Sequence, residues 1–166
     1  MPETAPIGVL LMAYGGPETM ADIPGYLADI RDGRPTPGRV LDEISANYDA
    51  IGGRSPLREH TERQASALSS LLAERGGGFR VYVGMRHAAP WIEDTVLQMI
   101  DDGVDRAVSL VLAPQFSSFS VARYQAKIGA GLQMYRGAIE FLHVDSYHDA
   151  PGLVEAFADR VRRGHS

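Results

Sequence analysis

The sequence predicts an α/β protein with an open parallel sheet of four strands and helices on both faces, as in flavodoxin-like proteins. Four short apolar runs, at residues 7–14, 79–85, 107–113 and 139–146, are bounded by Gly, Pro or polar residues. The first and third runs are apolar almost throughout, which is typical of strands buried on both faces. Helical patterns separate the runs, and strands that alternate with helices pair in parallel through right-handed crossovers.

Helices are predicted from apolar residues that recur every three or four positions. Three stripes show this spacing: Val40, Leu41, Ile44 and Tyr48; Ile92, Val96, Met99 and Ile100; and Leu153, Phe157 and Val161. Pro37, Pro56 and Pro90 each predict a helix start, because the first helical turn needs no amide hydrogen from proline. Three consecutive glycines, 76–78, predict the end of a helix before the second strand.

Composition excludes several classes of protein. A chain of 166 residues predicts one domain of ordinary size. With no cysteine it has no disulfide scaffold, thiolate nucleophile or Cys-ligated metal. The formal charge of −5 argues against a nucleic-acid partner. We also expect a cytoplasmic protein without an integral membrane segment, because the chain lacks an apolar run of about 18 residues and residues 1–6 do not resemble a signal peptide.

A parallel sheet of this kind binds ligands beyond the carboxyl ends of its strands. This rule selects the loops at residues 14–17, 86–88, 114–120 and 147–149. The chain has no G-x-G-x-x-G after its first strand, no Walker A lysine and no G-x-S-x-G. Dinucleotide, nucleoside triphosphate and serine hydrolase functions are therefore poorly supported.

The polar residues in these loops have two interpretations each. Tyr14 is either a half-buried residue at the end of a strand or a ligand. The Gly15-Gly16 pair either forms a sharp turn or allows a flat ligand to approach the backbone. His87 is expected to hydrogen bond at the end of its strand. Residues 143–148 contain a His-Asp-His set that is either a metal cluster or a solvated face.

Four segments in order resemble the N-terminal half of ferrochelatases, which insert Fe²⁺ into a porphyrin at the end of haem synthesis. They are residues 8–17 (GVLLMAYGGP), 48–57 (YDAIGGRSPL), 83–87 (VGMRH) and 112–117 (LAPQFS), the last followed by Tyr124. The resemblance implies a class II chelatase fold of two similar lobes with the porphyrin between them. Residues 1–166 would form the N-terminal lobe, and the C-terminal lobe would be absent.

The resemblance also implies a lyase that forms nitrogen–metal bonds, with Fe²⁺ as substrate and no organic cofactor. Within the family, the tyrosine of the first strand is similar to that of the bacterial type that uses coproporphyrin III; protoporphyrin IX is the other candidate substrate. The Tyr14 phenol would then reach the iron as axial ligand.

The same resemblance implies that the porphyrin and its propionates are bound by Arg31, Ser55 and Tyr124, beside Asn47 and Tyr48. Arg pairs with a carboxylate in a planar fork, and Ser and Tyr add neutral donors. Asn47 stands where coproporphyrin-type relatives often have a basic residue. Residues 18–31 would form one lip of the cleft, with apolar surface from Ile23, Tyr26, Leu27 and Ile30.

The resemblance implies no catalytic residue within this chain. Metal insertion requires a base that removes the pyrrole protons, and the family places the histidine and glutamate for this step in its C-terminal half. The His165-Ser166 pair follows a helix rather than a strand and does not match them. We therefore expect the isolated chain to be inactive. The alternatives are a compact homodimeric chelatase of the sirohydrochlorin or cobalt type, which would recruit His87, His143 or His148, and a non-catalytic porphyrin-binding fragment.

Overall fold

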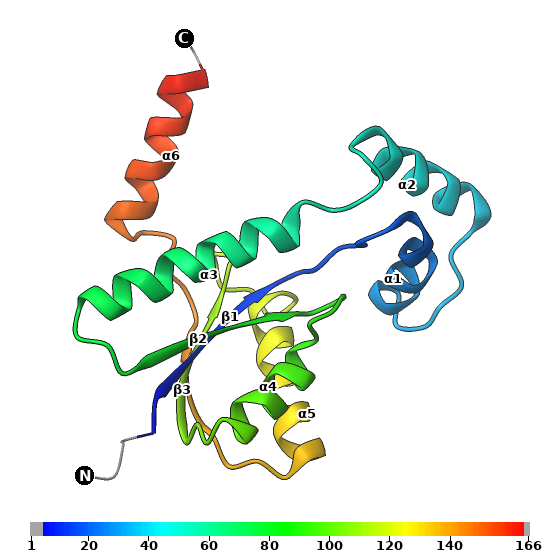
Figure 1. Ribbon diagram of the computed structural model, residues 1–166. Coiled ribbons are helices and arrows are strands. Elements are labelled where there is room, and N and C mark those ends of the chain that lie inside the picture. Colours follow the sequence, from blue (N-terminus) through cyan, green and yellow to red (C-terminus); the bar gives the residue numbers. More distant parts are fainter. Residues whose placement is uncertain (1–4, 165–166) are drawn as a thin grey trace.

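A computed structural model describes residues 5–164 and confirms the predicted α/β fold (Figure 1). The four apolar runs form the strands β1 (Ile7–Ala13), β2 (Phe79–Met85), β3 (Arg106–Val111) and β4 (Glu140–Val144). All neighbouring pairs are parallel, and the strand order is β2-β1-β3-β4. This is the flavodoxin-like order, with β1 at the centre of the sheet.

Helices cover the two faces of the sheet unequally. The helical elements are the 3₁₀ turn η1 (Met20–Asp22), α1 (Ile23–Ile30), α2 (Gly38–Ala50), α3 (Leu57–Glu74), α4 (Ile92–Asp101), α5 (Val121–Tyr135) and α6 (Pro151–Gly164). One face of β1 and β2 packs against α3, and α4 and α5 pack together on the other face (Figure 1). Helices α1 and α2 lie together beyond the end of β1.

The main core lies between the sheet and the α4–α5 layer. It is formed by Leu10 and Met12 of β1, Tyr82 of β2, Val111 of β3, Ile92, Val96 and Met99 of α4, and Val121, Tyr124 and Ile128 of α5. On the other face, Leu11 of β1 is 2% exposed, and Thr61 and Ala65 of α3 are buried. The prediction that the first strand is buried on both faces is therefore confirmed.

The structure corrects the predicted role of Pro90. Pro37 and Pro56 immediately precede α2 and α3, but α4 begins at Ile92, so Pro90 lies before the first helical turn. The Met85 N–H donates to the Pro90 carbonyl (2.6 Å), and Met85 pairs with Trp91 as an isolated bridge. This pairing holds residues 90 and 91 beside the end of β2 and delays the helix.

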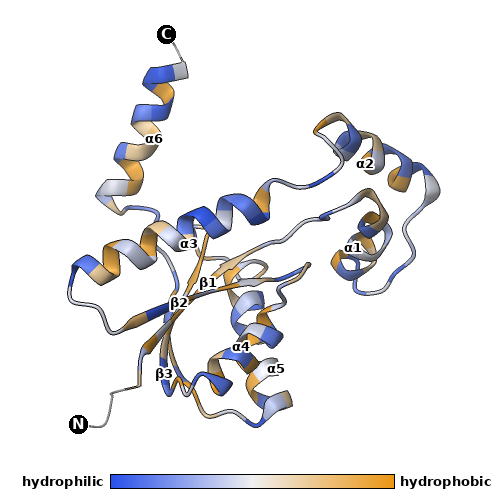
Figure 2. Ribbon diagram, viewed as in Figure 1, coloured by the Kyte–Doolittle hydropathy of each residue, from blue (hydrophilic) through white to orange (hydrophobic). Residues whose placement is uncertain are grey.

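The last helix also differs from expectation. Its apolar stripe is present, but no described residue of α6 is buried, and Phe157 and Val161 are 57% and 60% exposed. Figure 2 shows hydrophobic segments along α6, which extends away from the sheet. The helical period was therefore predicted correctly, although no element among residues 5–164 covers the stripe.

Candidate functional site

Tyr14 and His87 follow neighbouring strands at the carboxyl edge of the sheet. Backbone hydrogen bonds still join the two segments past the ends of the strands, because the Arg86 N–H donates to the Ala13 carbonyl (3.0 Å) and the His87 N–H donates to that of Tyr14 (2.9 Å). The phenol and imidazole rings consequently lie against each other, with centroids 4.5 Å apart and planes inclined by 53°. The Tyr14 side chain is 39% exposed, whereas His87 is 6% exposed.

Arg86 lies beside two tyrosines. Its guanidinium carbon is 5.9 Å from the ring centroid of Tyr14 and 5.5 Å from that of Tyr124. Both distances are within the range of cation–π attraction. Burial raises the pKa of Tyr124 to about 12, although the Arg86 charge acts in the opposite direction. The Tyr124 hydroxyl is therefore protonated at neutral pH and can act as a neutral donor.

The turn after β1 resolves the two interpretations of the glycine pair. Gly15 has φ +89°, a left-handed conformation that favours glycine. A Cβ at Gly16 would lie 2.5 Å from both Cβ and Oγ of Ser55, and 3.8 Å from the Tyr48 hydroxyl. Ser55 N–H also donates to the Pro17 carbonyl (2.8 Å). Gly15 therefore makes the turn, and the space at Gly16 is occupied by the α2–α3 loop.

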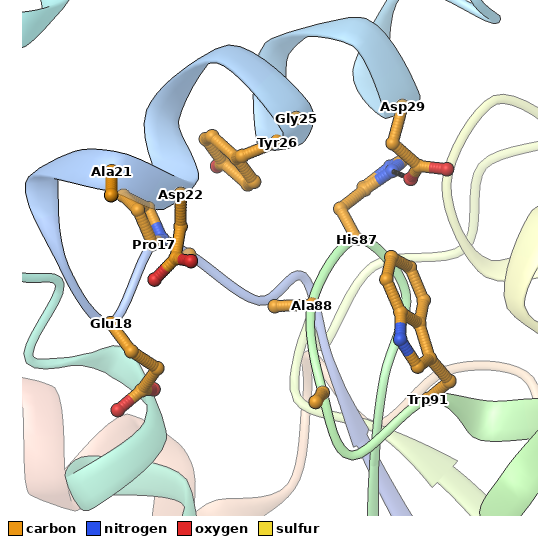
Figure 3. A pocket seen from close by; sticks show the side chains of 12 residues that line it. Pro17, Glu18, Ala21, Asp22, Gly25, Tyr26, Asp29, His87, Ala88 and Trp91 are labelled. Carbon is orange, nitrogen blue, oxygen red and sulfur yellow. Dashed lines mark hydrogen bonds and ion pairs between the residues drawn. The ribbon is translucent and has the colours of Figure 1, made fainter.

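An open pocket of about 650 Å³ lies between α1 and the loops that follow β1 and β2. Figure 3 shows its wall, which combines the turn after β1, one face of α1 and the β2–α4 loop. Its lining includes Tyr26, Asp29, His87 and Trp91. The Lys127 ammonium lies 5.6 Å from the centroid of the Trp91 indole and 2.7 Å from Oε1 of Glu93.

Asp29 and His87 join α1 to the edge of the sheet. The Asp29 Oδ2 and His87 Nδ1 atoms are 2.6 Å apart, as the dashed line in Figure 3 marks. Burial lowers the pKa of His87 below its ordinary value, although the hydrogen bond to Asp29 acts in the opposite direction. The imidazole is therefore neutral at physiological pH, and its Nδ1–H donates to the carboxylate. The expectation that His87 hydrogen bonds at the end of its strand is confirmed.

The structure brings four of the six predicted substrate-binding residues together. Tyr14 and Tyr124 meet at Arg86, and Tyr48 and Ser55 meet at Gly16, one residue beyond the Tyr14–Gly15 segment. The Tyr26 hydroxyl lies between these groups, 3.4 Å from the Gly15 carbonyl. Burial, and then its neighbour Tyr48, raise the pKa of Tyr26 above its ordinary range.

The other two predicted residues lie apart from these contacts. Arg31 directly follows the last residue of α1, and its buried Nε has no hydrogen-bond partner among the described residues. Asn47 is exposed on α2. None of the six predicted substrate-binding residues is among those that line the pocket beside α1.

The predicted apolar surface of the lip needs correction. Ile23 is fully buried and Leu27 is 9% exposed, so both face the interior instead of a cleft. Tyr26 and Ile30 are half-buried. Apolar residues occupy more than one side of this eight-residue helix. Their spacing therefore did not indicate which of them pack inward.

Arg86 and Asp29 were not among the predicted site residues. Arg86 is next to His87 in a loop selected from the sequence. Its position directly after a strand could have identified it as a candidate site residue. Asp29 had no comparable signal, because its partner His87 is 58 positions away in the sequence.

The histidines near the C-terminus do not form a metal cluster. His143 Nδ1 is 2.6 Å from Ser109 Oγ, and His148 Nδ1 is 2.6 Å from Ser146 Oγ. Asp145 accepts a hydrogen bond from Gln125 (2.8 Å). Within residues 5–164, no group of three or more His, Asp or Glu side chains is arranged to hold a metal ion. The His165-Ser166 pair lies outside the described residues.

None of the helices in residues 5–164 is both long enough and apolar enough to cross a membrane. The family model described as ferrochelatase matches residues 6–166 of the chain.

Curated relatives agree with this match. The chain is 56% identical to the ferrochelatase of Deinococcus radiodurans over 96% of its own length and 50% of that protein. It is 42% identical to the coproporphyrin III ferrochelatase of Halalkalibacterium halodurans and 39% identical to that of Staphylococcus saprophyticus. Those two alignments cover 93% and 95% of the chain, and 50% and 52% of the relatives. The chain thus spans about half the length of these relatives.

Proposed function

The chain belongs to the ferrochelatase family, and from this membership we propose that it is the N-terminal lobe of an enzyme that inserts Fe²⁺ into coproporphyrin III. The observation that carries the proposal is the Tyr14 phenol, which is 39% exposed at the carboxyl edge of the sheet while Arg86 and His87 contact its ring. A phenol that is held in place but open on one side suits an axial ligand to porphyrin iron. The name coproporphyrin III ferrochelatase, carried by relatives that align over most of the chain, supports the choice of porphyrin.

In this proposal, cationic and hydroxyl groups bind the propionates of the porphyrin. The buried Nε of Arg31 has no hydrogen-bond partner within residues 5–164, and a carboxylate would satisfy that donor. The hydroxyls of Ser55, Tyr48 and Tyr124 add neutral donors near Tyr14. Asn47 offers an exposed amide, which binds a carboxylate more weakly than a basic side chain would.

The described residues contribute binding and orientation to the proposed reaction. Tyr14 would contact the iron from one face of the macrocycle, and Arg31 and the hydroxyls would hold its rim. We assign the base that removes the pyrrole protons to the part of the enzyme beyond this lobe, because His87, whose ring contacts that of Tyr14, is buried and bonded to Asp29. A cytoplasmic location is part of the same proposal.

Porphyrin titration tests the proposal directly. Metal-free coproporphyrin III and protoporphyrin IX are added separately to the 166-residue chain, and binding is followed by the Soret band. We expect coproporphyrin III to bind with the higher affinity, and Tyr14→Phe to bind it about as well as the wild type. Iron insertion is measured in parallel, with the Deinococcus radiodurans ferrochelatase as positive control. Absence of porphyrin binding, or insertion by the chain at the rate of the control, would contradict the proposal.

A further inference from the structure

His87 occupies a position between the α1 lip and the proposed iron ligand. On one side its ring contacts the Tyr14 ring at 4.5 Å, and on the other its Nδ1 donates to Asp29 of α1. The backbone N–H of the same residue donates to the Tyr14 carbonyl. His87 is thus in contact with Tyr14 through both its main chain and its side chain.

The contacts of His87 leave its ring little freedom. The side chain is 6% exposed, and Nε2 is buried without a hydrogen-bond partner among the described residues. The bond to Asp29 is therefore the polar contact that determines the orientation of the imidazole plane. Removing the carboxylate would leave both ring nitrogens without a partner in a buried site, which favours a reorientation of the ring.

Asp29 belongs to α1, the helix that lies beyond the end of β1. Helix α1 contacts α2 and η1, and it buries Ile23 and Leu27. Its side-chain hydrogen bonds to the loops that follow β1 and β2 include the Asp29–His87 bond at 2.6 Å and the weaker contact of the Tyr26 hydroxyl with the Gly15 carbonyl at 3.4 Å. A displacement of α1 would consequently reach His87 through Asp29, and Tyr14 through His87.

From these contacts we propose that Asp29 and His87 are a pair of positioning residues that orient the Tyr14 phenol toward the metal. The inference rests on the proposed function, but the Asp29–His87 and His87–Tyr14 contacts that support it lie within this chain. Asp29 orients the imidazole, the imidazole orients the phenol ring, and the position of the α1 lip is thereby coupled to the axial ligand. Neither residue is required to contact the porphyrin or the iron.

The first test needs no porphyrin. The ring resonances of Tyr14 are assigned by NMR in the wild type, using Tyr14→Phe to identify them, and are then compared in Asp29→Ala and Asp29→Asn. We expect Asp29→Ala to shift or broaden the Tyr14 signals, because the neighbouring imidazole changes its orientation. Asp29→Asn should preserve them, because the amide oxygen still accepts a hydrogen bond from Nδ1–H. The control Asp32→Asn removes a charge from an exposed position in the turn that follows the lip, and it should leave the Tyr14 signals unchanged.

The second test measures coordination. Ferric coproporphyrin III is the probe, and the absorption and electron paramagnetic resonance signals of iron bound by a phenolate report the axial bond. Asp29→Ala should weaken this coordination by about tenfold while changing the affinity for metal-free coproporphyrin III by less than about threefold. Asp29→Asn should restore the coordination signal. Thermal unfolding followed by circular dichroism shows whether each variant is folded.

The outcomes separate the two proposals. Unchanged Tyr14 resonances in a folded Asp29→Ala variant overturn the positioning role, whatever the porphyrin does. Equal losses in Asp29→Ala and Asp29→Asn also overturn it, because they indicate that charge acts instead of the hydrogen bond. Failure of the wild type to bind either porphyrin contradicts the proposed function, and the NMR comparison still decides the positioning role.

Discussion

The ring of Tyr26 on α1 meets the ring of Tyr48 on α2 edge to face, with centroids 6.5 Å apart and planes inclined by 86°. The pair joins two helices that lie beyond the strands of the sheet. Because the Tyr26 hydroxyl approaches the Gly15 carbonyl and the Tyr48 hydroxyl lies near Gly16, the pair also sets the position of the lip relative to the turn after β1.

Breaking this aromatic pair should loosen the lip. We expect Tyr48→Leu to lower the free energy of unfolding by about 0.5–1.5 kcal/mol beyond the loss of buried area. A double-mutant cycle with Tyr26→Leu, measured by urea unfolding, isolates the coupling between the two rings. Purely additive effects of the two substitutions would show that the rings do not stabilise each other.

Gly16 should tolerate no side chain. Gly16→Ala places a methyl group against Ser55, and overpacking of this kind costs about 1–3 kcal/mol of stability. Ser55→Gly removes both atoms that would clash, so the double variant should recover part of the loss.

Gly25, which lies on helix α1, provides a matched control, because a Cβ there would meet no atom within 4 Å. Gly25→Ala should leave stability unchanged or raise it by up to about 1 kcal/mol. A Gly16→Ala variant as stable as the wild type would rule out the close packing at this turn.

Tyr124 and Tyr82 should make the protein less stable in alkali. Burial raises the pKa of Tyr124 to about 12; burial and then the hydrogen bond to Asp102 raise that of Tyr82 to about 12. The unfolded chain releases phenol protons near pH 10. These two groups therefore contribute their full stability below about pH 10, and that contribution is lost as the pH rises toward 12.

Replacement by phenylalanine tests this dependence. Urea unfolding of the wild type should show a free energy that falls between pH 10 and 12, by at most about 1.4 kcal/mol per pH unit for each phenol. Tyr124→Phe should show a smaller slope, and Tyr82→Phe with Tyr124→Phe a smaller slope still. Equal slopes in all three proteins would show that neither phenol is held in its protonated form by the fold.

Lys127 should stabilise the wall of the pocket through Glu93 and Trp91. The Lys127 and Glu93 side chains are 26% and 18% exposed, and Oε2 of Glu93 has no hydrogen-bond partner among the described residues. Lys127→Met leaves a partly buried carboxylate unpaired, and we expect a loss of about 1–3 kcal/mol. Adding Glu93→Gln removes that charge and should recover most of the stability. If Lys127→Met alone changes the urea midpoint no more than the double variant does, the ion pair contributes nothing.

The exposed stripe of α6 should contribute little to the stability of this chain. Phe157 is 57% exposed, so Phe157→Ser should change the free energy of unfolding by less than about 0.5 kcal/mol. Ile128 on α5 is 2% exposed, and Ile128→Ala should cost about 2–5 kcal/mol. Comparable losses in the two variants would indicate that α6 packs against the domain in solution.

The amino-acid sequence by itself determined the architecture of this protein. Its apolar runs predicted all four strands, and the alternation of strands and helices predicted the parallel sheet, because burial on both faces and helical period are local properties of the chain. The resemblance of its motifs also predicted the family and identified Tyr14, Tyr48, Ser55 and Tyr124 together as substrate-binding candidates.

Only the tertiary structure decided how these residues contact one another. Asp29 meets His87 across 58 positions, and Arg86 lies against tyrosines from β1 and α5. The burial of Ile23 and Leu27, the extended segment before α4 and the uncovered stripe of α6 likewise depended on neighbours that are distant in the sequence. Hydrophobic periodicity determines which side of an element is apolar, but it does not specify which partner covers that side.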